Sequence, residues 1–175
     1  TSSGSVVTSF IYIDNGMTEI DYYTHGIDAM KTSIAHEFFH AVQRFYKNYE
    51  GGPSLYFYEL SSAWIEDIIY PDINDYIAHG WTDNFFDYPF MTKPIDETDG
   101  YSIALYAHYL TSKISNNSII KDIWEKYASV SNDDPLYSIN NILKEEPYNT
   151  NFIKTWVDFI SLNFFNGFYS NITND

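Results

Sequence analysis

The order of apolar and polar positions predicts a chain that is mostly helical, with a short strand near its beginning. Residues 6–13 read VVTSFIYI, a β-branched and aromatic run followed by the turn signal DNG, which predicts a strand. Residues 28–49 repeat apolar side chains at helical spacing, which predicts a helix with Asp28 as its N-cap and the sequence EGGP as its stop. The apolar positions that give this helical spacing are Met30, Ile34, Phe38, Ala41, Val42 and Phe45.

A second helix is predicted at residues 54–70, where Ser54 is the candidate N-cap and Pro71 follows the end. Residues 71–100 are dense in Asp, Asn, Gly and Pro. That composition predicts a long surface loop, interrupted only by a short helix at residues 73–78.

Helical spacing returns in the second half of the chain, at residues 101–114, 118–128, 135–146 and 151–165. Asp134 and Pro135 are typical of a helix start and fit the third of these segments. In the last segment, the positions spaced for a core face are Phe152, Trp156, Phe159 and Ile160. The predicted fold class is therefore α+β and mostly helical, with a short N-terminal strand region and a helical body.

Length and composition predict the number of domains and exclude several classes of binding partner. A chain of 175 residues predicts one domain over residues 1–175. Because it begins without an initiator methionine or a signal peptide, we expect a fragment or processed part of a longer protein. A net charge of −15, with Arg44 as the single arginine, leaves no basic stripe for nucleic acid and disfavours anionic membranes. No apolar run reaches the roughly 18 residues of a membrane helix, and no cysteine is present for thiolate metal sites.

The sequence HEFFH at residues 36–40 has the spacing of a zinc site. On a helix, His36 and His40 project about 40° apart, so both imidazoles can converge on one ion at Zn–N distances of roughly 2.0–2.1 Å. Glu37 lies beside the same face and can reach a metal-bound water as a general base. The alternative is an ordinary pair of helix histidines that bind no metal.

Catalytic zinc usually has three protein ligands, and the next predicted helix supplies a third. Glu59 lies nineteen residues after His40, and a helix–turn–helix of that length can bring Glu59 back to the first helix. Glu66 follows two helical turns later, within roughly 20° of the direction of Glu59, among apolar neighbours. Such a carboxylate can orient a ligand histidine by a hydrogen bond. The alternative is that both glutamates are solvated surface residues.

The segments HEFFHAVQ and ELSSAWIEDIIYPDINDY resemble the gluzincin clan of zinc metallopeptidases, which includes thermolysin-like and aminopeptidase-N-like enzymes. They look closest to secreted prokaryotic metalloproteases with this same helix pair. The resemblance implies an extracellular, gluzincin-like catalytic domain with one Zn²⁺ on His36, His40 and Glu59. It also implies that Glu37 is the general base and that Glu66 supports a ligand histidine.

The match has departures and one further implication. Many relatives have glycine after the third ligand, where this chain has Leu60, and thermolysin-type relatives have aspartate where it has Ala63. The segment DGYSIALYAHYL resembles the aminopeptidase-like stretch that opens with an oxyanion-stabilising tyrosine, which implies that role for Tyr101. Tyr106 and His108 are the alternatives, and Tyr101 can instead be a core aromatic at a helix start.

The expected function is a zinc-dependent endopeptidase acting on peptides or proteins. Aminopeptidases of the similar branch hold the substrate amine with a Gly-x-Met-Glu-Asn segment, and this chain has FIYIDNGM there, with Asp14 at a predicted turn. Two other functions stay open: a zinc-bearing binding module without catalysis, and a metal-free helical fragment.

The acidic stretches PDIND and DETDG can ligate Ca²⁺ but lack EF-hand spacing, so we expect them to be turn residues. His25 and His79 are expected in loops.

Overall fold

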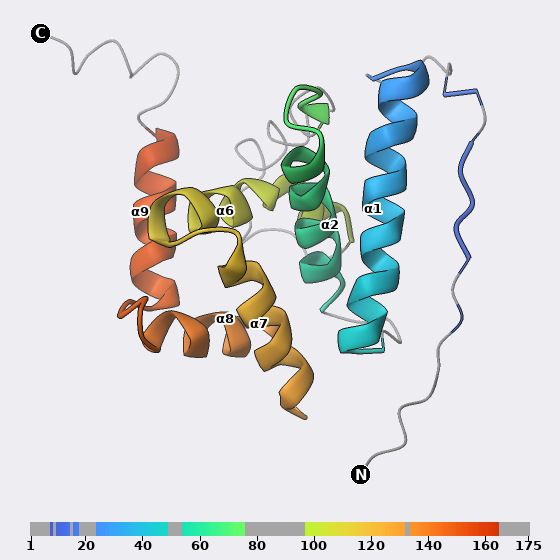
Figure 1. Cartoon of the computed structure of the whole chain (residues 1–175). Helices are drawn as coiled ribbons and strands as arrows, with labels where there is room; N and C mark the ends of the chain where they lie inside the picture. Colours follow the sequence, from blue (N-terminus) through green and yellow to red (C-terminus); the bar gives the residue numbers. More distant parts are fainter. Residues whose placement is uncertain are drawn as a thin grey trace, which may run out of the picture. The chain divides into compact units, whose positions relative to one another are not determined.

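The computed structural model describes residues 8, 10–14, 16–17, 24–48, 54–75, 97–131 and 134–164, with side chains of residues 97–99 and 164 excepted. The chain divides into two compact units, Thr1–Ala107 and His108–Asp175, which are described separately. Helices make up most of the described residues, and none of these residues lies in a strand (Figure 1). The prediction of a mostly helical chain is therefore confirmed.

The first unit is built around a pair of antiparallel helices, α1 (Gly26–Tyr46) and α2 (Leu55–Ile69), which pack side by side (Figure 1). A shorter helix, α5 (Glu97–Ser102), packs against α2. α2 forms the centre of this unit, and its buried apolar side chains are Tyr56, Phe57, Tyr58, Leu60, Ala63 and Trp64. The next helix, α6 (Ala104–Tyr109), spans the boundary between the two units.

The second unit continues with the π-helix η1 (Leu110–Ile114), followed by α7 (Ser118–Ser129), α8 (Pro135–Lys144) and α9 (Phe152–Phe164). α7 packs against η1 and α8, and α8 packs against α9. Its fully buried side chains include Ile119, Ile123, Trp124, Tyr127 and Leu143. The predicted helices at residues 118–128, 135–146 and 151–165 are confirmed within a few residues at their ends.

The predicted N-cap of α8 is confirmed, whereas that of α1 is wrong. At α8 the Asp134 carboxylate accepts a hydrogen bond from the Leu136 backbone N–H at 2.9 Å, as expected of an N-cap. α1 begins earlier than predicted, with His25 at the N-cap position. Asp28 lies inside the first turn instead, where it forms an ion pair with Lys31 at 2.7 Å. Glu50 to Pro53, the predicted stop EGGP, lie outside the described residues.

The predicted helix at residues 101–114 is divided into three pieces. α5 begins at Glu97, inside the predicted surface loop, and a turn at Ile103 separates it from α6 and then η1. Ser54 occupies the N-cap position of α2 but makes no side-chain capping bond. Residues 76–96, which carry most of the predicted loop and its short helix, lie outside the described residues.

The predicted strand at residues 6–13 does not appear in its described part, residues 8 and 10–13. Phe10 and Tyr12 in this segment are 78% and 85% exposed. β-branched and aromatic residues form a strand only when a neighbouring strand supplies backbone hydrogen bonds, and the described residues provide none. The strand component of the predicted α+β class is therefore not supported by the described part of the chain.

The apolar positions of α1 do not form its buried face. Ile34, Phe38 and Phe45 are 42%, 59% and 89% exposed. The buried residues of this helix are Ala29, Thr32, Ala35, His36 and Gln43. Helix positions two apart point to nearly opposite sides, so burial of these polar residues turns the apolar stripe outward. The cause lies in α2, which presents carboxylates and hydroxyls that hydrogen-bond the polar face of α1.

In α9, Phe159 is buried, as predicted, but Ile160 is 38% exposed, and Thr155 occupies part of the buried face. No helix among the described residues combines the length and apolar character that crossing a membrane requires.

Candidate metal centre

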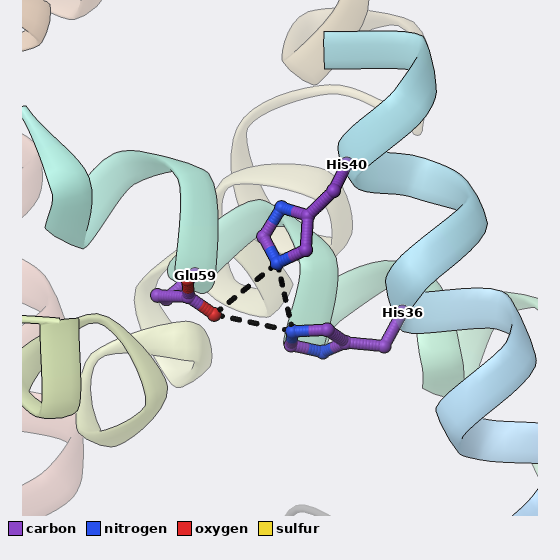
Figure 2. Close-up of side chains that lie close together, drawn as sticks. All are labelled: His36, His40 and Glu59. Atoms are coloured by element: carbon purple, nitrogen blue, oxygen red, sulfur yellow. Dashed lines mark hydrogen bonds and ion pairs between the residues drawn. The ribbon is translucent and has the colours of Figure 1, made fainter. Parts of the chain in front are cut away.

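The site begins with the spacing of two histidines on α1. His36 and His40 lie one turn apart, and their side chains point toward α2 (Figure 2). Their Nε2 atoms are 3.1 Å apart, with the ring planes at 82° to each other. His36 is buried and His40 is half-buried. Two ring nitrogens therefore face the same small space, as the sequence predicted.

α2 brings a carboxylate to these nitrogens. The Glu59 Oε2 atom lies 3.1 Å from His36 Nε2 and 3.5 Å from His40 Nε2 (Figure 2). Two ligands each about 2.05 Å from a tetrahedral ion are about 3.3 Å apart, so the three observed separations suit such an ion. His36, His40 and Glu59 form a group that can hold a metal ion.

The outer nitrogen of each histidine is held by an oxygen acceptor. His36 Nδ1 lies 2.5 Å from the Glu66 Oε1 atom, and His40 Nδ1 lies 2.8 Å from the Gln43 Oε1 atom. A carboxylate or amide oxygen can only accept, so each Nδ1 carries a proton, and each imidazole in its neutral form presents the lone pair of Nε2 inward. The lone pairs and the Glu59 carboxylate repel one another unless a cation lies between them.

Gln43 is a site residue that the sequence analysis missed. Its side chain is fully buried, and its amide nitrogen lies 2.9 Å from the Tyr58 carbonyl oxygen and 3.0 Å from both Ser61 Oγ and Ser62 Oγ. The carbonyl can only accept, so the amide nitrogen must face it and the amide oxygen must face His40. The available signal was a glutamine three residues after His40, a neighbouring position on the same helix face.

The carboxylates change the protonation of the site when no metal is bound. Burial disfavours a charged His36, but hydrogen bonds with Glu59 and Glu66 outweigh it and raise the pKa of His36 to about 9. Burial likewise disfavours a charged Glu59, but its bonds with His36 and His40 lower the pKa of Glu59 to about 2. At neutral pH the site therefore attracts a positive charge strongly enough to retain a proton.

Tyr101, on α5, covers the His36 imidazole. The two rings stack at an interplanar angle of 4° with centroids 5.3 Å apart, and the Tyr101 hydroxyl lies 3.1 Å from His36 Nε2. Burial above all, and then the charge of Glu59, raises the pKa of Tyr101, so the phenol keeps its proton at neutral pH. The alternatives Tyr106 and His108 both lie on α6.

Glu37, the predicted general base, is exposed on α1 beside His36. Its negative charge contributes, after burial and the charges of Glu59 and Glu66, to the raised pKa of Tyr101. The Glu37 carboxylate is therefore near enough to the Tyr101 hydroxyl for its charge to act on it.

The other sequence candidates lie elsewhere. The Asp14 carboxylate accepts hydrogen bonds from the backbone N–H groups of Gly16 and Met17, each at 3.2 Å, as expected of a turn residue. His25 is exposed at the start of α1, and His79 is outside the described residues.

Within the described part of the chain, no second group of three His, Cys, Asp or Glu side chains is placed to hold a metal ion, so PDIND gains no support as a Ca²⁺ site. The side chains of DETDG are outside the described set.

Comparison with known proteins finds no family model, no curated protein and no solved structure that matches the chain. The resemblance to gluzincins therefore rests on the sequence segments themselves.

Proposed function

We propose that the chain is a zinc-dependent metallopeptidase that cleaves internal peptide bonds. One observation carries this proposal: two histidine Nε2 atoms and one carboxylate oxygen converge while hydrogen bonds hold the outer histidine nitrogens. Two imidazoles and a glutamate are a ligand set that catalytic zinc uses, and Zn²⁺ accepts the tetrahedral spacing found here. The resemblance of HEFFH and its partner helix to gluzincins supports the same reading.

The residues divide the chemistry between them. A bound Zn²⁺ would supply Lewis acidity that activates water near neutral pH and polarises a peptide carbonyl. Glu37 would take the proton of the attacking water and pass it to the leaving amine. The protonated Tyr101 hydroxyl would donate a hydrogen bond to the carbonyl oxygen as negative charge develops on it. Glu66 and Gln43 would keep the two imidazoles aimed.

The proposal of internal cleavage rests on Asp14. An aminopeptidase needs an anion to hold the substrate's terminal ammonium, and Asp14 is the acidic candidate in the corresponding stretch. Its two carboxylate oxygens each accept a backbone hydrogen bond from the turn that follows. A carboxylate that accepts these bonds supports a turn and does not anchor a terminal ammonium. Without such an anchor, an extended substrate chain can pass through the site in both directions, and no free amino terminus is needed.

The experiment is a paired assay on zinc-loaded protein. Internally quenched peptides blocked at both ends should be cut by the wild type, and Glu37→Gln should lose roughly 10²–10⁴-fold in rate because it removes a positioned base. The variant should still bind zinc, because Glu37 is not in the ligand group. Equal turnover by both proteins would exclude Glu37 as the base. Cleavage confined to peptides with a free amino terminus would contradict internal cleavage and indicate that Asp14 holds the substrate's ammonium group.

A second candidate function is a zinc-bearing binding module without catalysis. The observation in its favour is a pair of departures from the gluzincin pattern: Leu60 in place of the glycine after the third ligand, and Ala63 in place of the thermolysin-type aspartate four residues after it. Full zinc binding with no wild-type hydrolysis of any peptide in the same assay would favour it.

A further inference from the structure

Gly100 of α5 lies against α2 with no room for a side chain. This residue is buried, and a Cβ atom built on it would lie 2.5 Å from the Glu59 Cβ and 2.5 Å from the Tyr56 carbonyl oxygen. Real Cβ atoms essentially never approach other heavy atoms below 3.0 Å. The two helices can therefore touch here only because position 100 has no side chain.

Backbone conformation does not explain this glycine. Gly100 lies within helix α5, and its φ is outside the left-handed region that favours glycine. Glycine weakens a helix relative to alanine, so its presence in a helix calls for another reason. The available reason is the space that Glu59 and the α2 backbone fill.

The contact joins two parts of the metal centre. On one side it meets Glu59, whose carboxylate faces both histidines. On the other side the next residue along the chain is Tyr101, whose ring stacks on His36. The α2 backbone at this point is buried, with Tyr56 and Phe57 at 3% and 1% exposure. A side chain at position 100 would therefore displace α5, and with it Tyr101, or push Glu59 away.

We propose that Gly100 is a positioning residue of the metal centre. Its missing side chain lets α5 lie against α2, which places the Glu59 carboxylate and the Tyr101 hydroxyl together at the histidine nitrogens. The inference deepens the proposed function and rests on it for the presence of a metal. It assigns no chemical step to Gly100, which acts only through its two neighbours.

The test compares two glycine substitutions. Gly100→Ala should weaken Zn²⁺ binding about tenfold or more, the scale expected when the groups that hold metal ligands move. It should also change the visible absorption spectrum of bound Co²⁺, which responds to ligand geometry. Gly26→Ala is the matched control, because Gly26 has a φ of +62° and nothing within 4 Å of an added Cβ. It should strain the start of α1 and leave both metal readouts unchanged.

A third variant tests the part of the proposal that concerns Tyr101. If Gly100→Ala displaces the phenol, the Co²⁺ spectrum of Gly100→Ala should change in the same direction as that of Tyr101→Ala. Folded Gly100→Ala with wild-type Zn²⁺ affinity and Co²⁺ spectrum would overturn the proposal. So would equal losses of affinity in Gly100→Ala and Gly26→Ala, because these would reflect general destabilisation.

A crystal structure of the wild-type chain decides the matter if Gly100→Ala does not fold. A Cβ built on Gly100 should lie under 3.0 Å from Glu59, with Tyr101 stacked on His36, and a gap above 3.4 Å would overturn the proposal. A wild type that binds no metal would contradict the proposed function, whereas this structure would still test the packing at Gly100 separately.

Discussion

The two ligand histidines are held by acceptors of different charge. The carboxylate of Glu66 bonds His36 Nδ1, and the neutral amide of Gln43 bonds His40 Nδ1. A carboxylate partner increases the basicity of the imidazole that it holds, whereas an amide mainly fixes the orientation. His36 is also the more buried of the two, so we expect it to be the more strongly bound ligand.

Removal of the amide tests the role of Gln43. Gln43→Leu keeps a similar volume but removes the amide oxygen 2.8 Å from His40 Nδ1 and leaves the more distant Ser62 Oγ, at 3.2 Å, so Zn²⁺ affinity should fall roughly 10–100-fold. The measurement is competition with a chelating dye. Ser61→Ala is the matched control, because it removes one partner of the Gln43 amide nitrogen and leaves the bond to His40 in place. Equal affinities of Gln43→Leu and wild type would show that His40 is oriented by other groups.

At the scale of the element, α1 shows what periodicity can and cannot predict. The spacing of its apolar residues correctly predicted a helix, and the spacing of His36 and His40 correctly predicted that they converge. The spacing does not tell which side of α1 is buried, because that depends on α2, whose Ser61, Ser62 and Glu66 bond the polar face. Single-helix patterns contain no information about a partner's hydrogen-bonding groups.

Two phenylalanines of the first unit test this orientation. Phe45→Ala, at an α1 position 89% exposed, should change the free energy of unfolding by no more than about 0.5 kcal/mol. Phe57→Ala, at an α2 position 1% exposed, should cost about 3–5 kcal/mol because it leaves a cavity. Denaturant unfolding of both variants is the measurement. A loss at Phe45 as large as that at Phe57 would mean that the apolar face of α1 is buried in solution.

At the scale of the whole molecule, local signals located most of the candidate site. His36, His40, Glu59 and Glu66 each follow from spacing along one or two helices, and the structure brings all four together. The contribution of Gly100 could not be predicted in this way, because it depends on the approach of α5 to α2. The missing strand has a similar cause, since strand formation depends on a pairing partner.

The stability of the metal-free protein should depend on pH through His36. Its pKa is about 9 in the folded state against a usual value of 6.5, because Glu59 and Glu66 outweigh burial. The folded state therefore holds an additional proton between these values, so the stabilisation is complete below pH 6.5 and is lost as pH rises through 9. His40 and Tyr101 also face this ring. Denaturant unfolding of chelator-treated protein at pH 6 and pH 9.5 measures the loss, and equal stabilities would contradict it.

Glu59 gives the opposite dependence at acid pH. Its pKa is lowered from 4.5 to about 2, so its contribution is present above pH 4.5 and is lost as pH falls through 2. The two groups together predict greatest stability of the metal-free protein between about pH 4.5 and 6.5. Zinc and the His36 proton compete for the same nitrogen, so apparent zinc affinity should rise with pH up to about 9.

The most direct test of the account is the zinc content of the purified chain after loading and removal of free metal. We expect about one Zn²⁺ per chain for the wild type, because three ligand atoms of suitable type converge. His40→Ala should retain almost none, whereas His25→Ala, at the exposed N-cap histidine of α1, should retain about one. A wild type without zinc, or His40→Ala with full zinc, would contradict the assignment of a metal centre to His36, His40 and Glu59.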